Sequence, residues 1–263
     1  MDAVLWQLRV LAGWIPATGT RLVRAAAGGF EMANILALAR SFAAADGSAA
    51  PTTAPPARFY DMGSLSTAWP RLRTSTDGRQ LAARLLSSPW GDVWPRETPT
   101  AAPSSLRDTL TVAWITRLAR VAPGAWPWAQ GSASLRAARM LLVDQVTPAP
   151  HFLHLVRPVI GTAWQRASSL TTLTDTLPRG IRPLLHDLDG PQDLWRAEAR
   201  LTSRIEEDGF RMLRGSSPGP EVVLGAITVI ALDAWRVRAA LAAAEAGGAT
   251  LTVDAREVLD ALA

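Results

Sequence analysis

The sequence predicts an all-α protein, and two observations support this. Apolar residues recur at steps of three and four along most of the 263 residues, which is the spacing of one face of a helix. Signals for β-strands are almost absent, since the run at 251–253 is too short to matter. We therefore expect a single all-helical domain over residues 1–263, which is long enough to bury a sizeable core.

The longest predicted helix covers residues 218–248. Pro220 suits a first helical turn, and two glycines end the pattern at 247–248. No charge occurs from 222 to 232, which predicts a helix whose first half is fully buried and whose second half reaches the surface with Asp233, Arg236 and Arg238. This run is also shorter than the roughly 20 apolar residues of a membrane span. The preceding helix follows Pro191, so a helical hairpin is expected over residues 190–248.

The N-terminal part is predicted as three helical pieces. Residues 4–11 form a short helix that Gly13 ends. A second piece covers 20–29, where Gly28 and Gly29 interrupt the pattern. A third continues from Phe30 to about residue 46.

Two Pro-rich connectors separate the next elements, at about 46–58 and 89–103. Short capped helices are expected between them, at 64–72 and 77–86. An amphipathic helix follows at 104–122.

The pattern is more broken toward the middle. Residues 122–131 are expected to form a turn, 132–146 a helix, and 148–158 a loop or short helix. Small helical pieces interrupted by proline follow over 161–188. A last short helix is predicted after the hairpin, capped by Asp254.

Composition excludes several functions. The chain has no cysteine and no lysine, which removes thiolate chemistry, Cys-based zinc sites, the Walker A loop and Schiff-base chemistry. The net charge is only +4, and the arginines are scattered among acids, so no nucleic-acid partner is expected. Asp2 and Arg9 break the pattern of a signal peptide, which favours a cytoplasmic location.

Three histidines are the only candidate metal ligands beyond carboxylates. His151 and His154 are three residues apart, and His186 stands beside Asp187. A helical metal-dependent enzyme that uses these histidines is therefore an alternative function, but structural or surface histidines are the favoured interpretation. The carboxylates at 206–208 are interpreted as a solvated face with i, i+4 ion pairs.

Tryptophan is unusually abundant, with eleven residues. Trp114, Trp164, Trp195 and Trp235 sit within helical patterns and are expected in the core. The tryptophans near prolines in loops are candidate exposed anchors for a partner. They are Trp69, Trp90, Trp94, Trp126 and Trp128.

A weak internal repeat links the two ends of the chain. Each copy has an acid, a polar residue three positions on, and then a β-branched apolar residue. The copies are Glu31, Asn34 and Ile35 near the start, and Asp233, Arg236 and Val237 near the end.

At these residues the chain resembles the C subunit family of V/A-type rotary ATPases, which includes the eukaryotic d subunit. The family carries helices with an acid–x–x–Asn–Leu/Ile pattern followed by Arg. The resemblance extends over residues 20–45 and 190–250, and in the second copy Arg236 replaces the usual Asn. The matching residues are Glu31, Asn34, Ile35, Arg40, Trp195, Arg196, Glu198, Asp233, Trp235, Arg236 and Arg238.

The resemblance implies a funnel-like arrangement of three related helical lobes. It implies a non-catalytic connector subunit of a proton- or sodium-translocating ATPase, which links the central stalk to the membrane rotor ring. No cofactor, catalytic residue or metal site is expected, and the partners would be other ATPase subunits at the cytoplasmic side of the membrane. The alternatives are the histidine-based metal enzyme and an uncharacterised helical protein-interaction module.

Overall fold

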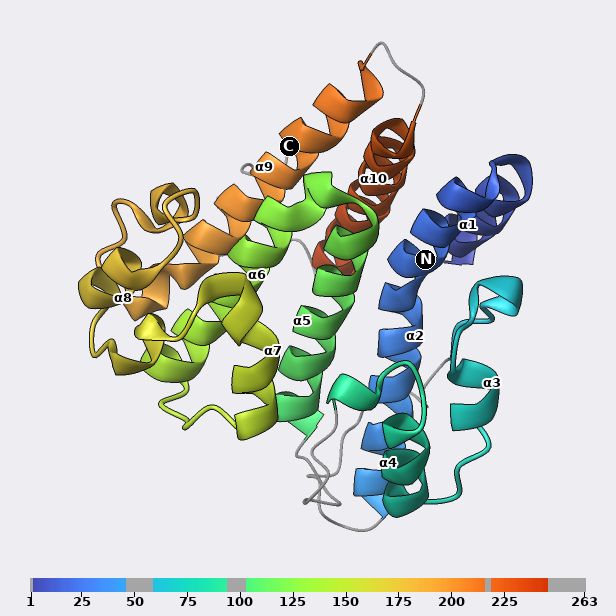
Figure 1. The fold of residues 1–263 in the computed structure, drawn as a ribbon, viewed down its shortest axis with the longest axis horizontal. Helices are drawn as coiled ribbons and strands as arrows, with labels where there is room; N and C mark the ends of the chain where they lie inside the picture. Colours follow the sequence, from blue (N-terminus) through green and yellow to red (C-terminus); the bar gives the residue numbers. More distant parts are fainter. Residues whose placement is uncertain (1, 46–58, 94–102, 216–218, 246–263) are drawn as a thin grey trace.

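The computed structural model of the protein describes residues 2–45, 59–93, 103–215 and 219–245 (Figure 1). These residues are mostly helical and contain no strand, which confirms the all-α prediction. The α-helices are α1 (Asp2–Trp14), α2 (Ala17–Ala45), α3 (Trp69–Leu72), α4 (Gly78–Leu86), α5 (Pro103–Val121), α6 (Trp126–Ala138), α7 (Pro150–Ile160), α8 (Leu170–Thr176), α9 (Leu194–Leu213) and α10 (Pro220–Glu245).

Short turns connect these helices. The 3-10 turns are η1 (Gly63–Leu65), η2 (Gly91–Val93), η3 (Pro123–Ala125), η5 (Ala163–Arg166), η6 (Arg182–Leu185) and η7 (Pro191–Asp193), and η4 (Arg139–Val143) is a π-helical turn. The expected connector at 46–58 and the expected helix after Asp254 lie outside the described residues.

The centre of the fold is the pair α2 and α5, which pack against each other (Figure 1). On one side α1, α3 and α4 pack on α2, and on the other α6 and α7 pack on α5. Helix α10 packs mainly on α9 and also contacts α2. Two neighbouring long helices therefore carry most of the remaining elements.

Two hydrophobic clusters are built on these helices. The larger joins the first part of α2 and the second part of α5 to α1, α6, α7, α9 and α10. The smaller joins the later part of α2 and the first part of α5 to α3, α4 and Trp90. The partly buried Trp114 packs against both clusters.

The predicted break at Gly28 and Gly29 is wrong, because α2 is continuous from Ala17 to Ala45. These glycines provide room for Trp114 of α5. A Cβ atom at Gly28 would lie 3.1 Å from the Trp114 ring, and one at Gly29 would also lie 3.1 Å from it. Close helix packing accounts for the two glycines, which sequence reasoning took as a helix stop.

The expected turn at 122–131 is helical over its second half. Helix α6 begins at Trp126, and Pro127 lies in its first turn, where a missing N–H is tolerated. The region 148–158, expected as a loop or short helix, lies mostly within α7, which contains Pro158. The second predicted connector is described only at residues 89–93 and 103, and Trp90 within it is only 2% exposed and belongs to the smaller cluster.

Helix α10 is less buried than predicted. In the first half Leu224, Gly225, Ile227 and Thr228 are buried, but Ile230 is half-buried and Ala231 is exposed. The reason is that part of this half borders a groove. The second half faces solvent on several sides, as its charges predict.

Among the described residues, α2 is the one helix with the length and apolar composition to cross a membrane. Half of its most apolar window is buried inside the fold, as in a core helix.

Candidate interaction groove

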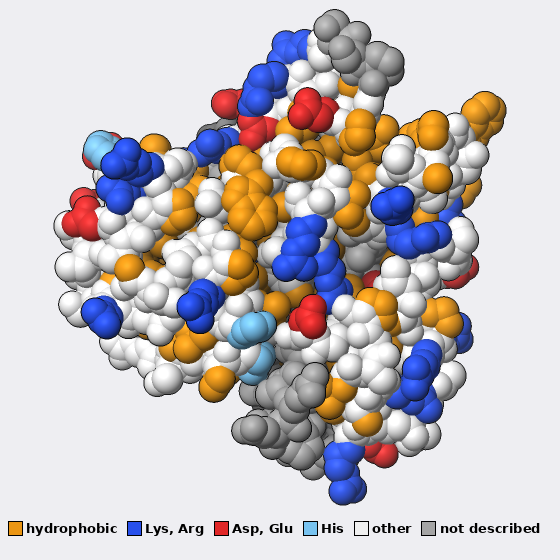
Figure 2. Space-filling model, in the orientation of Figure 1, with side chains coloured by type: hydrophobic (Ala, Val, Ile, Leu, Met, Phe, Trp, Pro, Cys, Tyr) orange, Lys and Arg blue, Asp and Glu red, His pale blue; other side chains and the backbone are white. Residues whose placement is uncertain are grey.

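An apolar groove of about 560 Å³ runs between α2 and α10. Helices α5, α6 and α9 and the N-terminal α1 also contribute to its lining. Figure 2 shows hydrophobic side chains on this face of the molecule, over α10 and α1. Among the described side chains that line the groove, only Arg238 is charged. Such a surface suits a helix that presents an apolar face.

Several of the α2 residues that line the groove have small side chains. Ala26, Gly29 and Ala33 line the groove at helical spacing, with Phe30 beside them. Small side chains let the backbone of another helix come close. The α2 wall therefore has the shape expected of a helix-docking surface.

Three tryptophans form part of the groove lining, and hydrogen bonds fix two of them. Trp114 Nε1 donates to the carbonyl oxygens of Ala25 and Ala26, at 3.0 and 3.3 Å. Trp128 Nε1 donates to Asp208 Oδ2 at 2.8 Å, and Asp208 is also ion-paired with Arg211. Because both indoles are held in place, the shape of the groove is largely preformed.

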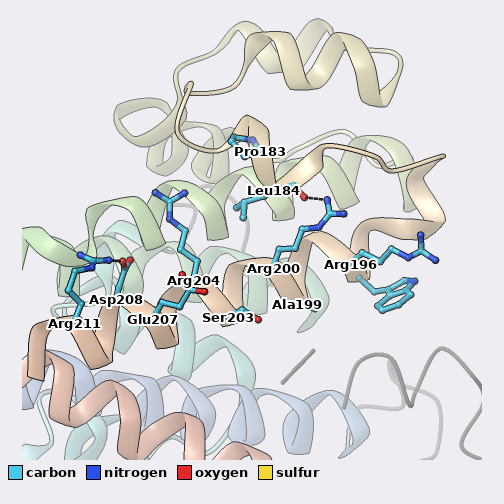
Figure 3. A pocket seen from close by; sticks show the side chains of 11 residues that line it. Pro183, Leu184, Arg196, Ala199, Arg200, Ser203, Arg204, Glu207, Asp208 and Arg211 are labelled. Atoms are coloured by element: carbon cyan, nitrogen blue, oxygen red, sulfur yellow. Dashed lines mark hydrogen bonds and ion pairs between the residues drawn. The ribbon is translucent and has the colours of Figure 1, made fainter. Parts of the chain in front are cut away.

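A second pocket, of about 720 Å³, lies along the outer face of α9 (Figure 3). Arginines at helical spacing line this pocket, but two of them donate hydrogen bonds to backbone carbonyl oxygens of the segment before α9. Arg200 Nη1 donates to the carbonyl oxygens of Leu184 and His186, and Arg204 Nη1 donates to that of Gly180 at 2.8 Å. These bonds hold the segment before α9 against the helix, so the arginines do not make a free anion site.

Glu31, from the sequence pattern, is fully buried in α2. Its carboxylate accepts hydrogen bonds from the backbone N–H groups of residues 67–69 at 2.7–2.9 Å. The hydroxyls of Ser66 and Thr67 and the Trp90 indole N–H also donate to it. Burial alone would raise the pKa of Glu31, but these hydrogen bonds outweigh it and hold the pKa below its ordinary value.

Asn34 lies one turn further along α2 and is also buried. Its Nδ2 donates to the Tyr60 carbonyl at 2.9 Å, and its Oδ1 accepts from the Tyr60 N–H at 2.7 Å. Glu31 and Asn34 together fix residues 60–69 to α2. Ile35 is buried in the smaller cluster, and Arg40 is exposed.

The second copy of the pattern has a different environment. Asp233 is exposed, and Arg236 forms a bidentate pair with Glu206 of α9, at 2.7 and 2.6 Å. Trp235 and Arg238 line the groove. The repeat in sequence is therefore not a repeat in structure, because only the first copy holds a loop.

The remaining predicted residues lie at the start of α9. Trp195 is half-buried, and the Arg196 guanidinium lies over its ring, 5.3 Å from the centroid. Glu198 is exposed and pairs with Arg139 at 2.9 Å. These residues are apart from the groove.

The histidines do not form a shared site. His151 and His154 lie on α7, and His186 follows η6, where it pairs with Asp187 at 2.7 Å. Burial lowers the pKa of His151. Within the described part of the chain, no group of three or more His, Cys, Asp or Glu residues could hold a metal ion.

The tryptophan predictions are partly wrong. Trp69, Trp90 and Trp128 are buried, and Trp94 lies outside the described residues. Trp235, expected in the core, is 41% exposed. Trp6 and Trp14 on α1, which sequence reasoning did not single out, are the most exposed of the described tryptophans.

Comparison with known proteins identifies no relative: no family model, no curated protein and no solved structure matches the chain.

Proposed function

We propose that the chain is a non-catalytic connector subunit of a V/A-type rotary ATPase, linking the central stalk to the membrane rotor ring. The groove between α2 and α10 carries this proposal, since an apolar, preformed groove suits a helix of the stalk. The resemblance at Glu31, Asn34 and Ile35 to the C subunit family of V/A-type rotary ATPases supports the choice of this complex. Under this proposal the related helical lobes form a funnel, and the protein acts at the cytoplasmic face of the membrane without a cofactor.

Copurification tests this function. A mild-detergent affinity purification from the native host, followed by mass spectrometry, should recover rotor-ring and central-stalk subunits in near-equal amounts. Recovery of other proteins would instead indicate a different helical interaction module. A clean protein without ATPase subunits would contradict the proposal.

A matched pair of variants tests the groove itself. Ala231 lies exposed on the α10 wall of the groove, so Ala231→Asp places an unpaired charge in the apolar contact without burying it in the free protein. Ala240 is exposed on the same helix and does not line the groove. We expect Ala231→Asp to lower recovery of stalk subunits at least about tenfold, which corresponds to about 1.4 kcal/mol. Ala240→Asp should leave it unchanged, and equal recovery from both variants would remove the groove from the interface.

A further inference from the structure

The second half of α10 is unusually apolar for a solvent-facing surface. Trp235, Val237 and Leu241 are 41%, 53% and 59% exposed. Trp235 also lines the groove, and exposed apolar side chains beside an apolar groove are of the kind that normally marks a docking site. The chain following this surface is the closest candidate to cover it.

The segment 249–263 has the pattern of an amphipathic helix. Ala255, Val258, Leu259 and Leu262 recur at helical spacing after the capping residue Asp254. The opposite face carries the acids Glu257 and Asp260. The segment therefore offers one apolar face about half as long as the groove wall formed by α10, at 1.5 Å per residue.

The connection is long enough for this segment to fold back. Residues 246–253 can span about 26 Å, at roughly 3.3 Å per residue. The groove wall at Ala231 lies about 21 Å back along α10 from Glu245, at 1.5 Å per residue. Gly247 and Gly248 allow the reversal. Short connections of this kind place consecutive helices side by side and antiparallel.

The charges also match. Arg238 lines the groove, and no ion pair or hydrogen bond to it is present among the described residues. The segment 249–263 has three acids and one arginine, and Asp254 lies at the edge of the apolar face. An acid beside Arg238 would complete an ion pair at the edge of the contact.

We infer that the segment 249–263 docks as a helix in the groove between α2 and α10, with its apolar face inward and Asp254, at the edge of that face, near Arg238. A tethered segment acts at an effective concentration near millimolar, so modest affinity is sufficient. If the proposed function holds, the segment competes with the partner helix, and binding of the partner displaces it. The docking itself does not depend on that function.

Cross-linking in the isolated full chain tests the docking, and the absence of native cysteine makes it clean. One variant carries Ala33→Cys on the α2 wall and Leu259→Cys in the segment. The comparison variant carries Ala244→Cys with Leu259→Cys. A short bis-maleimide reagent should cross-link the Ala33/Leu259 pair within one chain at least about fivefold faster. If the segment were free, the Ala244/Leu259 pair should cross-link faster than the Ala33/Leu259 pair. Ala244 is only fifteen residues before Leu259, and the effective concentration of a tethered group falls as the tether becomes longer.

A second substitution probes the apolar face. Leu262→Asp, added to the Ala33/Leu259 pair, should slow the cross-link at least about fivefold. Ala261→Asp, on the opposite face of the predicted helix, should leave it unchanged. In chains that retain the native cysteine-free background, Leu262→Asp should also raise the fluorescence of the apolar dye ANS, and Ala261→Asp should not. This measurement applies even if the cysteine variants fold poorly.

The outcomes separate the two proposals. Preferred cross-linking of the Ala33/Leu259 pair within one chain supports docking, whether or not ATPase subunits copurify. Cross-links between two chains would overturn the inference in favour of a second copy as the occupant. Equal or slower cross-linking than in the Ala244/Leu259 pair, or equal dye binding by the two Asp variants, would overturn it too.

Discussion

Glu31 is a buried carboxylate that is stabilised mainly by hydrogen-bond donors. Backbone N–H groups at the start of α3, two hydroxyls and the Trp90 indole surround it. The Arg117 guanidinium lies over the other side of that indole, 4.4 Å from the ring centroid. A single side chain on α2 thus holds two separate segments, the one before α3 and the one at η2.

Replacing this carboxylate should be costly. Glu31→Gln preserves the shape but replaces one accepting oxygen with an NH₂ group, so several buried donors lose their partner. We expect a loss of about 2–3 kcal/mol in the free energy of unfolding, measured from urea transitions. Glu207→Gln is the control, because Glu207 is exposed on α9, and it should change stability by less than about 0.5 kcal/mol.

The stability difference between the natural protein and Glu31→Gln should also depend on pH. The folded-state pKa of Glu31 lies below its ordinary value, so its stabilising effect is complete above the pKa of the unfolded chain, about 4.3. The effect is lost as the pH falls through that value toward the lower folded-state pKa. The stability difference between the natural protein and Glu31→Gln should therefore shrink below about pH 4. A difference that stays constant into acid would show that Glu31 is not the ionised acceptor.

The sequence identifies Glu31 and Asn34 but not their hydrogen-bond partners. The acid–x–x–Asn spacing singled out Glu31 and Asn34. Their hydrogen bonds reach Tyr60, residues 66–69 and Trp90, which are far away in the chain. For the same reason Trp90 and Trp128 looked like exposed loop residues. Each is buried because a helix carboxylate accepts its indole N–H, and no local pattern encodes that.

At the scale of elements, the α9–α10 pair depends on close backbone contact. A Cβ atom at Gly225 of α10 would lie 2.6 Å from the carbonyl oxygen of Gly209 and 3.0 Å from the backbone nitrogen of Leu213. Backbone atoms cannot move aside as a flexible side chain can. The two helices can approach this closely because residue 225 is glycine.

Gly225→Ala should therefore destabilise the protein, although alanine favours helices by about 1 kcal/mol. We expect a net loss of about 2 kcal/mol from forced separation of the helices. Gly13→Ala in α1 is the matched control, since a Cβ atom there meets nothing within 4 Å, and it should stabilise slightly. Thermal unfolding followed by circular dichroism distinguishes the two. A stabilised Gly225→Ala protein would contradict the close contact.

Helical character was predictable over most of the chain, and helix boundaries were not. Periodicity located α5, α9 and α10 because each has a long, regular apolar face. It divided α2 at Gly28 and Gly29, since the role of those glycines lies in a helix more than eighty residues away. It also assigned residues 126–131 to a turn, because proline in a first helical turn and proline in a loop look alike in sequence.

At the scale of the whole molecule, the groove could not be read from the sequence. Its lining comes from α1, α2, α5, α6, α9 and α10, and each contributes residues that look like ordinary core positions. The first half of α10 was expected to be fully buried, and its exposure at Ala231 was missed for a related reason. An uncharged run predicts burial, but only the fold determines which face a neighbour covers.

The two hydrophobic clusters should unfold together. Ile35 belongs to the smaller cluster, yet its helix also supplies Leu22 and Val23 to the larger one, and α5 bridges them in the same way. Ile35→Ala leaves a cavity at a fully buried site and should cost about 2–4 kcal/mol. Because α2 and α5 are continuous, that loss should appear equally in α4 and in α9, although α9 has no residue in the smaller cluster. Native-state hydrogen exchange measures this helix by helix, since the slowest amides report global unfolding. Reduced protection confined to α3 and α4 would mean that the smaller cluster opens as a separate unit.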